Sequence, residues 1–204
     1  MTMPSTGVLN MGGTSSPVSV NFELGKASPY NQIVSMNDAA VRTLAGVSST
    51  SGSSWSMNSL YGKSNRTVAF NNANVFTGIG AGTPCSLTLT FTSTGTITTA
   101  VTGAGSSWTA PSSFISPTGD TTGMSVRCNF TSITRSGAAV VSVFGTTVGA
   151  VSSYDSGYVS FAGANKVITG SSSSISNVFS GSGTIYITDG TTTISRSITF
   201  DLNI

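Results

Sequence analysis

The residue types that carry most enzyme chemistry are scarce in this chain of 204 residues. It contains no histidine, so the usual serine and cysteine catalytic triads cannot be assembled. Catalysis by carboxylates needs a close pair, yet the six acidic residues are isolated in sequence. They are Glu23, Asp38, Asp120, Asp155, Asp189 and Asp201. This pattern predicts that the protein is not an enzyme.

The cysteines and the one lysine-containing glycine motif do not indicate a cofactor either. Cys85 and Cys128 are far apart, whereas zinc sites need clustered cysteines or added histidines. Each cysteine is in phase with the apolar face of a predicted strand, which favours packed thiols and leaves a disulfide as the alternative. Gly62-Lys63-Ser64 resembles the end of a phosphate-binding loop, but Met57 stands where that loop needs its first glycine. We therefore expect no metal and no cofactor.

Aromatic side chains are the remaining candidates for a binding site. Trp55, Trp108, Tyr154 and Tyr158 could stack on a sugar ring, although aromatics in β domains more often belong to a core or an interface. A receptor-binding or glycan-binding module would need an exposed cluster among Trp108, Tyr154 and Tyr158. This class of function is one alternative interpretation.

Charge and hydropathy argue against nucleic acid and membrane as partners. The net charge is +2 and the basic residues are scattered singly, without the basic stripe that nucleic-acid binding requires. The most apolar stretch, residues 138–151, is interrupted by hydroxyl residues and is shorter than the ~20 residues of a spanning helix. Residues 1–7 lack the charged and apolar regions of a secretory signal. We expect synthesis in a cytoplasm and no membrane insertion.

Elements able to position these residues are mainly β-strands. Charged residues make up 7% of the chain, against roughly 25% in typical soluble domains, and apolar residues recur in short alternating runs. The pattern predicts strands at 67–71, 85–92, 96–101, 124–131, 139–144, 158–161, 166–169, 184–188 and 191–202. Asp189-Gly190 predicts a two-residue type I′ hairpin turn between the last two. Since no long helical segment separates the strands, we expect an all-β fold, an antiparallel Ig-like β-sandwich of about seven strands, over residues 66–204.

Residues 1–65 differ from the sandwich and contain the only plausible helical segments. A capping sequence at 35–38 precedes an apolar face with Val41 and Leu44, and Gly46 is suited to end the helix. A second short element is expected at 56–62. Because both elements are too short to be stable alone, we expect an N-terminal docking arm whose short helices attach to a partner.

The run VSVNFELGKASPYNQIVSMNDAAVRTLAGVSSTSGSSWSMNSLYGKS, residues 18–64, resembles a segment that recurs at the start of tailed-bacteriophage virion proteins. The parts that carry the resemblance are ELGKA, SMNDAAVRTLAGV and SMNSLYGKS. The remainder is similar in layout to the β-sandwich modules that follow this segment. The resemblance implies a structural protein of the virion, made in the bacterial cytoplasm of the host and attached to the tail or its tip. A capsid-surface decoration or head fibre is the alternative within this class.

The resemblance also implies partners and an anchoring surface. The partners would be other virion proteins and copies of the chain itself, with possible contact to a host surface. Apolar side chains of the arm would be buried in the interface, while Arg42 and Lys63 would pair with carboxylates or remain solvated. The predicted docking residues are Met36, Val41, Arg42, Leu44, Leu60, Tyr61 and Lys63.

Overall fold

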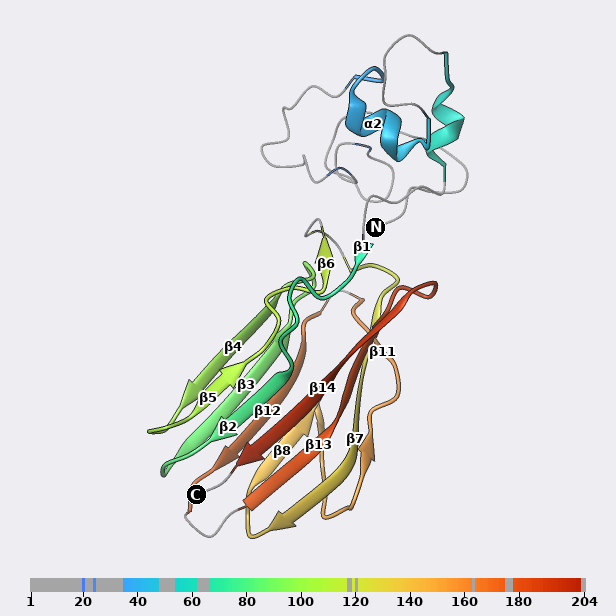
Figure 1. Ribbon diagram of the computed structural model, residues 1–204. Coiled ribbons are helices and arrows are strands. Elements are labelled where there is room, and N and C mark those ends of the chain that lie inside the picture. Colours follow the sequence, from blue (N-terminus) through green and yellow to red (C-terminus); the bar gives the residue numbers. More distant parts are fainter. Residues whose placement is uncertain are drawn as a thin grey trace. The chain divides into compact units, whose positions relative to one another are not determined.

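A computed structural model describes residues 20, 24, 35–47, 54–61, 67–116, 119, 121–162, 164–174 and 178–202 (Figure 1). The chain divides into two compact units. The first comprises Met1–Thr67 and Ser116–Asp120, and the second comprises Val68–Ile115 and Thr121–Ile204. Within the described residues no helix is long and apolar enough to cross a membrane.

The N-terminal unit contains the two short helical elements that the sequence predicts. Helix α2 spans Ala39–Leu44 and the 3-10 helix η1 spans Met57–Leu60. Ahead of α2, the Asp38 carboxylate accepts a hydrogen bond from the Ser35 backbone N–H at 3.0 Å. Gly46 adopts a positive φ of 73°, and the backbone bonds that follow α2 form a Schellman motif, as expected for a helix that ends at a glycine.

These elements bury their apolar side chains against one another. Val41, Leu44 and Leu60 lie with Val20 and Ala45 in one buried cluster. Three separate segments of the unit therefore contribute to a small common core.

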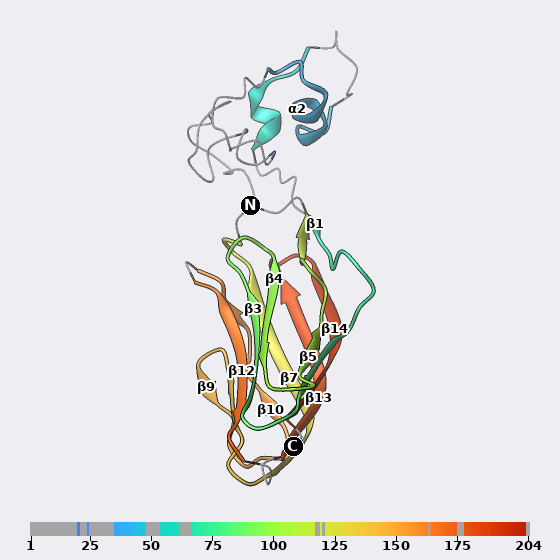
Figure 2. The same ribbon diagram turned by 90° about the vertical axis from the view of Figure 1, so that its left-hand side faces the viewer.

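The second unit is an all-β sandwich, which confirms the predicted fold class (Figures 1 and 2). One sheet has seven strands in the order β10-β7-β13-β14-β2-β5, with β11 also paired to β7, and the other has five in the order β4-β3-β12-β8-β9. The strands of the first sheet are β2 (Phe76–Gly80), β5 (Ser107–Thr109), β7 (Ser125–Ser136), β10 (Tyr154–Asp155), β11 (Val159–Ser160), β13 (Val178–Thr188) and β14 (Thr193–Leu202). Those of the second are β3 (Cys85–Phe91), β4 (Ile97–Thr102), β8 (Val140–Val143), β9 (Thr146–Thr147) and β12 (Lys166–Ser172), and β1 (Thr67–Val68) pairs with β6 (Ile115–Ser116).

Strand pairing departs from the antiparallel prediction at one position. β14 runs parallel to β2, with Ile198 opposite Phe76 and Leu202 opposite Gly80. A parallel pair needs a long connection, which in most proteins is a helix. Here the connection is nearly the whole sandwich, since β2 is among its first strands and β14 is its last. The predicted antiparallel pairing is therefore wrong at this one pair. The absence of helices between successive strands does not exclude a parallel pair between strands that are far apart in the chain.

The interior between the two sheets is rich in phenylalanine. Ring contacts link Phe76 to Phe91 at 5.7 Å between centroids, Phe91 to Phe114 at 6.2 Å, and Phe114 to Phe161 at 5.3 Å. The inward alternation of β3 and β7 supplies much of the remaining core, as their sequences predict. Apolar burial of this kind is the main source of stability in a sandwich.

The hairpin between β13 and β14 is wider than predicted. The last paired residues are Thr188 and Thr193, so residues 189–192 form a four-residue loop and the predicted two-residue turn is wrong. The Asp189 carboxylate accepts hydrogen bonds from the backbone N–H groups of Thr191 and Thr192, at 2.9 and 2.7 Å, which stabilises the longer loop. Gly190 has a positive φ of 90°, as the sequence predicts.

β7 and β13 approach each other closely at a bulge. Gly183 is opposite Phe130 while Ser182 is opposite Ser132, so Thr131 is an extra residue in β7. A Cβ atom at Gly183 would lie 1.9 Å from the backbone oxygen of Asn129. This position therefore requires glycine, which is common where two backbones come into contact.

Candidate functional site

The predicted docking residues lie in different environments of the N-terminal unit. Val41, Leu44 and Leu60 are buried in its own cluster, and Arg42 is fully buried as well. Met36 and Tyr61 are half-buried. Lys63 lies outside the described residues. The structure thus brings the three aliphatic residues together as core, and the docking role of the set stays a prediction.

The three aromatic residues expected for a glycan site do not form an exposed cluster. Trp108 and Tyr154 pack against the core of the sandwich, and the Trp108 ring lies 5.7 Å from that of Phe200. Both residues are in strands whose alternation turns them inward, opposite Gly78 and Phe130 respectively. Only Tyr158 points outward, with 48% of its surface exposed.

Tyr158 instead belongs to a polar and aromatic cluster on the outer face of the seven-stranded sheet, which we call the Arg127 cluster. It consists of Arg127, Asp155, Tyr158 and Tyr186. Arg127 lies on β7 directly opposite Tyr186 of β13, and Asp155 is opposite Asn129, two residues further along β7. The guanidinium carbon lies 5.4 Å from the Tyr186 ring centroid and 5.8 Å from that of Tyr158. Both rings make cation–π contacts with this single charge.

The charges of the cluster stabilise one another. Arg127 Nε donates to Asp155 Oδ1 at 2.8 Å, and Arg127 Nη2 donates to Asp155 Oδ2, so the pair is bidentate. The hydrogen bond from Arg127 lowers the pKa of the Asp155 carboxyl, and the bond with Asp155 raises the pKa of Arg127. Both groups stay charged near neutral pH. The guanidinium is thereby held in a fixed orientation.

A short loop after β10 positions the carboxylate. Asp155 Oδ1 accepts a hydrogen bond from the Gly157 backbone N–H at 2.9 Å. Ser156 Oγ accepts from the Cys128 N–H at 2.9 Å and donates to the Gly157 carbonyl at 2.8 Å, which fixes the loop to β7. The cluster is therefore a preorganised surface with two aromatic rings, one cation and one anion. Such a surface is suited to stacking and hydrogen bonding with a polar ring compound.

The cysteines are separate, buried residues. Cys85 and Cys128 are both free thiols, which confirms the preference for packed thiols over a disulfide. Burial raises the pKa of the Cys128 thiol, so it stays protonated and unreactive in the folded protein. In the described part of the chain, no group of three or more His, Cys, Asp or Glu residues is arranged to hold a metal ion.

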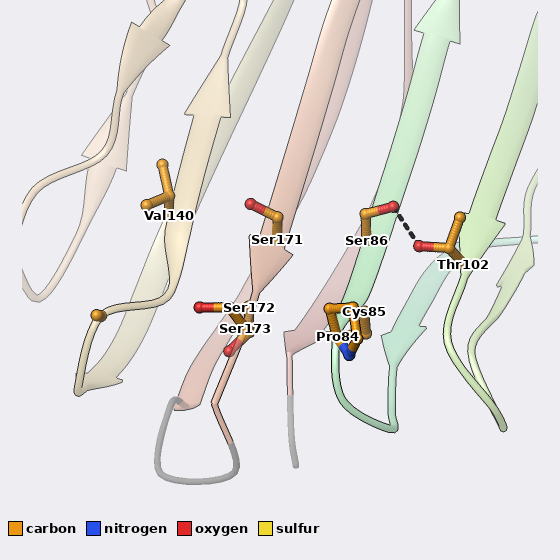
Figure 3. A pocket seen from close by; sticks show the side chains of 9 residues that line it. Pro84, Cys85, Ser86, Thr102, Val140, Ser171, Ser172 and Ser173 are labelled. Atoms are coloured by element: carbon orange, nitrogen blue, oxygen red, sulfur yellow. Dashed lines mark hydrogen bonds between the residues drawn. The ribbon is translucent and has the colours of Figure 1, made fainter.

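A shallow depression on the outer face of the five-stranded sheet is the other candidate site (Figure 3). Its volume is about 300 Å³, and a row across four strands, Val140, Ser171, Ser86 and Thr102, forms much of its lining. Ser86 and Thr102 hydrogen-bond each other through their hydroxyls at 2.7 Å. The lining residues carry no charge, so the depression offers hydroxyl groups to a ligand but no ion pair.

Comparison of the chain with protein-family models, with curated proteins and with solved structures finds no match. In the Arg127 cluster, the alternation of apolar and polar residues in β7 is enough to place Arg127 on the outward face of its strand. Tyr186 also alternates with buried residues, but its position beside Arg127 depends on the register between strands, which sequence patterns leave open.

Proposed function

We propose that this protein is a structural component of a tailed-phage particle, attached to the tail or tail tip through its N-terminal unit. The observation that supports this best is the segment at residues 18–64, which resembles the opening segment of virion proteins, followed by a β-sandwich. The surface of the sandwich is solvated mainly by Ser and Thr hydroxyls, since only 7% of the chain is charged, and we take such an uncharged polar surface to suit a structural role. Other virion proteins would be the partners of the N-terminal unit.

The N-terminal unit has properties that suit an anchor. Its described core contains five residues, so little apolar area holds it together compared with the sandwich. Units of this size gain stability when they bind a partner that favours their folded form. Met36 and Tyr61 are half-buried, and in this proposal they extend the apolar contact onto a neighbour.

Leu44→Asp tests the anchoring role in phage that encodes the full chain. Leu44 is 6% exposed, so a carboxylate there disrupts the N-terminal core, while the sandwich has its own core. We expect purified particles to lose the protein. Ala40→Asp, at an exposed position of the same helix, is the matched control and should be retained. Leu44→Asp particles with wild-type occupancy would contradict the proposal, and locating the chain in particle images would distinguish tail from capsid.

The Arg127 cluster favours a second candidate function, binding of a surface glycan. Aromatic faces beside a fixed ion pair are a common way to bind sugar rings, and Tyr158 is the most exposed part of the cluster. Tyr158→Ala should weaken binding to host-surface polysaccharide by about tenfold or more. Thr199→Ala, exposed on the same sheet, should leave binding unchanged. Equal binding by both variants would eliminate this candidate.

A further inference from the structure

Strand β4 leaves part of its backbone without hydrogen-bond partners. On one side it pairs with β3 along its full length, from Ile97 opposite Phe91 to Thr102 opposite Ser86. On the other side, the Ile97 N–H donates to the Ser112 carbonyl at 2.9 Å. The backbone N–H and C=O groups of successive residues in a strand point alternately to its two neighbours. Those of Thr99 and Val101 therefore point away from β3, like those of Ile97. No described residue hydrogen-bonds their N–H groups. Figure 2 is viewed from the side of this edge.

This edge also lacks the features that normally protect a sheet from pairing with another chain. The sequence Ile-Thr-Thr-Ala-Val-Thr contains no charge, proline or glycine. Residues 98–102 are all exposed, and Val101, which would point inward in a closed sandwich, keeps 41% of its surface accessible. The other strands at sheet edges, β5, β9, β10 and β11, are two or three residues long. β4 is thus the longest edge strand among the described residues.

We propose that β4 is a self-association edge, at which two copies of the chain pair antiparallel around a two-fold axis through Ala100. Two residues that exchange hydrogen bonds must both point their backbone N–H and C=O groups at the other strand. This places Thr99 opposite Val101 of the second copy, and Val101 opposite Thr99 of the second copy. Ala100 then lies opposite Ala100 of the second copy in the closer, non-hydrogen-bonded position. The two five-stranded sheets become one continuous sheet.

A second copy of the chain is the occupant that the strand itself favours. A two-fold interface places the same surface on both sides, so the strand must be compatible with itself. In this register Thr98 is opposite Thr102 of the second copy, a pair of β-branched residues that suits a sheet. The small side chain of Ala100 fits the axis, where the strands are closest. Because the strand is uncharged, no like charges are brought together.

The oligomeric state of the full chain tests this pairing. Sedimentation should give a concentration-dependent species of twice 20.5 kDa. Ala100→Lys places two ammonium groups directly opposite each other, so this variant should sediment as a single copy. At concentrations too low for the wild type to pair, the two proteins should melt alike. Val140→Lys is the control, because Val140 is 49% exposed on the same sheet but lies on β8, away from the β4 edge. It should still form the dimer.

A cross-link locates the axis independently of any effect of lysine on folding. Opposite Cβ atoms in a non-hydrogen-bonded pair are about 4.5–5.5 Å apart, close enough for a disulfide after small adjustments. Ala100→Cys should therefore give a covalent dimer under mild oxidation, which reductant reverses, and Val140→Cys should not. The native cysteines are buried and do not compete. A single-copy mass at every concentration, a dimer that survives Ala100→Lys, or equal cross-linking of both cysteine variants would each overturn the proposal. None of these results depends on whether the chain is incorporated into a phage particle.

Discussion

Gly183→Ala should be one of the most damaging single substitutions in the sandwich. The added Cβ would lie 1.9 Å from the Asn129 carbonyl oxygen and 2.7 Å from the Phe130 Cα. Both are backbone atoms of β7, so no change of rotamer can relieve the overlap. The two strands must separate at the bulge, where Gly183 is paired with Phe130 at the centre of the seven-stranded sheet.

The cost combines overpacking with lost backbone pairing. Overpacking of a well-packed site costs about 1–3 kcal/mol, and each weakened ladder hydrogen bond adds about 1 kcal/mol. With one or two such bonds, the expected loss is about 2–5 kcal/mol of unfolding free energy. For a domain of this size, each kcal/mol lowers the Tm by about 3–4 °C, so the Tm should fall by about 6–20 °C.

Gly149→Ala is the matched control, because its Cβ would meet no atom within 4 Å and its φ is ordinary. Its stability should change by less than about 0.5 kcal/mol. Thermal unfolding followed by circular dichroism, together with urea titration, compares the two variants. If the Tm of Gly183→Ala lay within about 2 °C of that of Gly149→Ala, the close approach of the two backbones would be refuted.

Three further predictions concern the hairpin loop, the thiols and the surface ion pair. Gly190→Val should cost about 1–2 kcal/mol of stability, because φ is 90° there, and unchanged urea unfolding would argue against this loop conformation. Thiol titration of Cys85 and Cys128 should find both free in the unfolded, unreduced protein and neither accessible in the folded one. A titration that finds none on unfolding would indicate a disulfide. The pKa of Asp155 is lowered from 3.8 on folding, so its contribution to stability is present above that pH and is lost as the pH falls through the folded value. Asp155→Asn should lack this part of the acid dependence of unfolding, and parallel pH profiles for variant and wild type would contradict the assignment.

Strands with regular alternation were predictable from the sequence, but strands that contain glycine were not. β3 and β8 lie close to their predicted bounds, because apolar residues alternate with Ser and Thr. The first half of β13 was missed, since Ser180-Gly181-Ser182-Gly183 resembles a turn. In the structure Gly181 lies against the rings of Phe130 and Phe179.

β2 was missed for the same physical reason. Its Gly78 lies beneath the Trp108 ring, and a Cβ at Gly80 would lie 2.6 Å from a methyl group of Leu202. These glycines make room for large neighbours from distant strands, information that a local pattern does not contain. The Arg127 cluster was hidden for a related reason. Its four residues come from four strands or loops, and only the strand register brings them together.

The parallel pairing of β2 with β14 determines how the sandwich responds to mechanical force. β2 begins at Phe76, near one end of the sandwich, and β14 finishes at Leu202, near the other end. The two strands run in the same direction. A force that pulls the two ends of the sandwich apart therefore acts along these strands and loads their hydrogen bonds in shear. From Phe76–Ile198 to Gly80–Leu202 the bonds share the load and must rupture together, whereas an antiparallel hairpin pulled at its ends opens one bond at a time. The sandwich should consequently resist stretching better than its thermal stability alone would indicate.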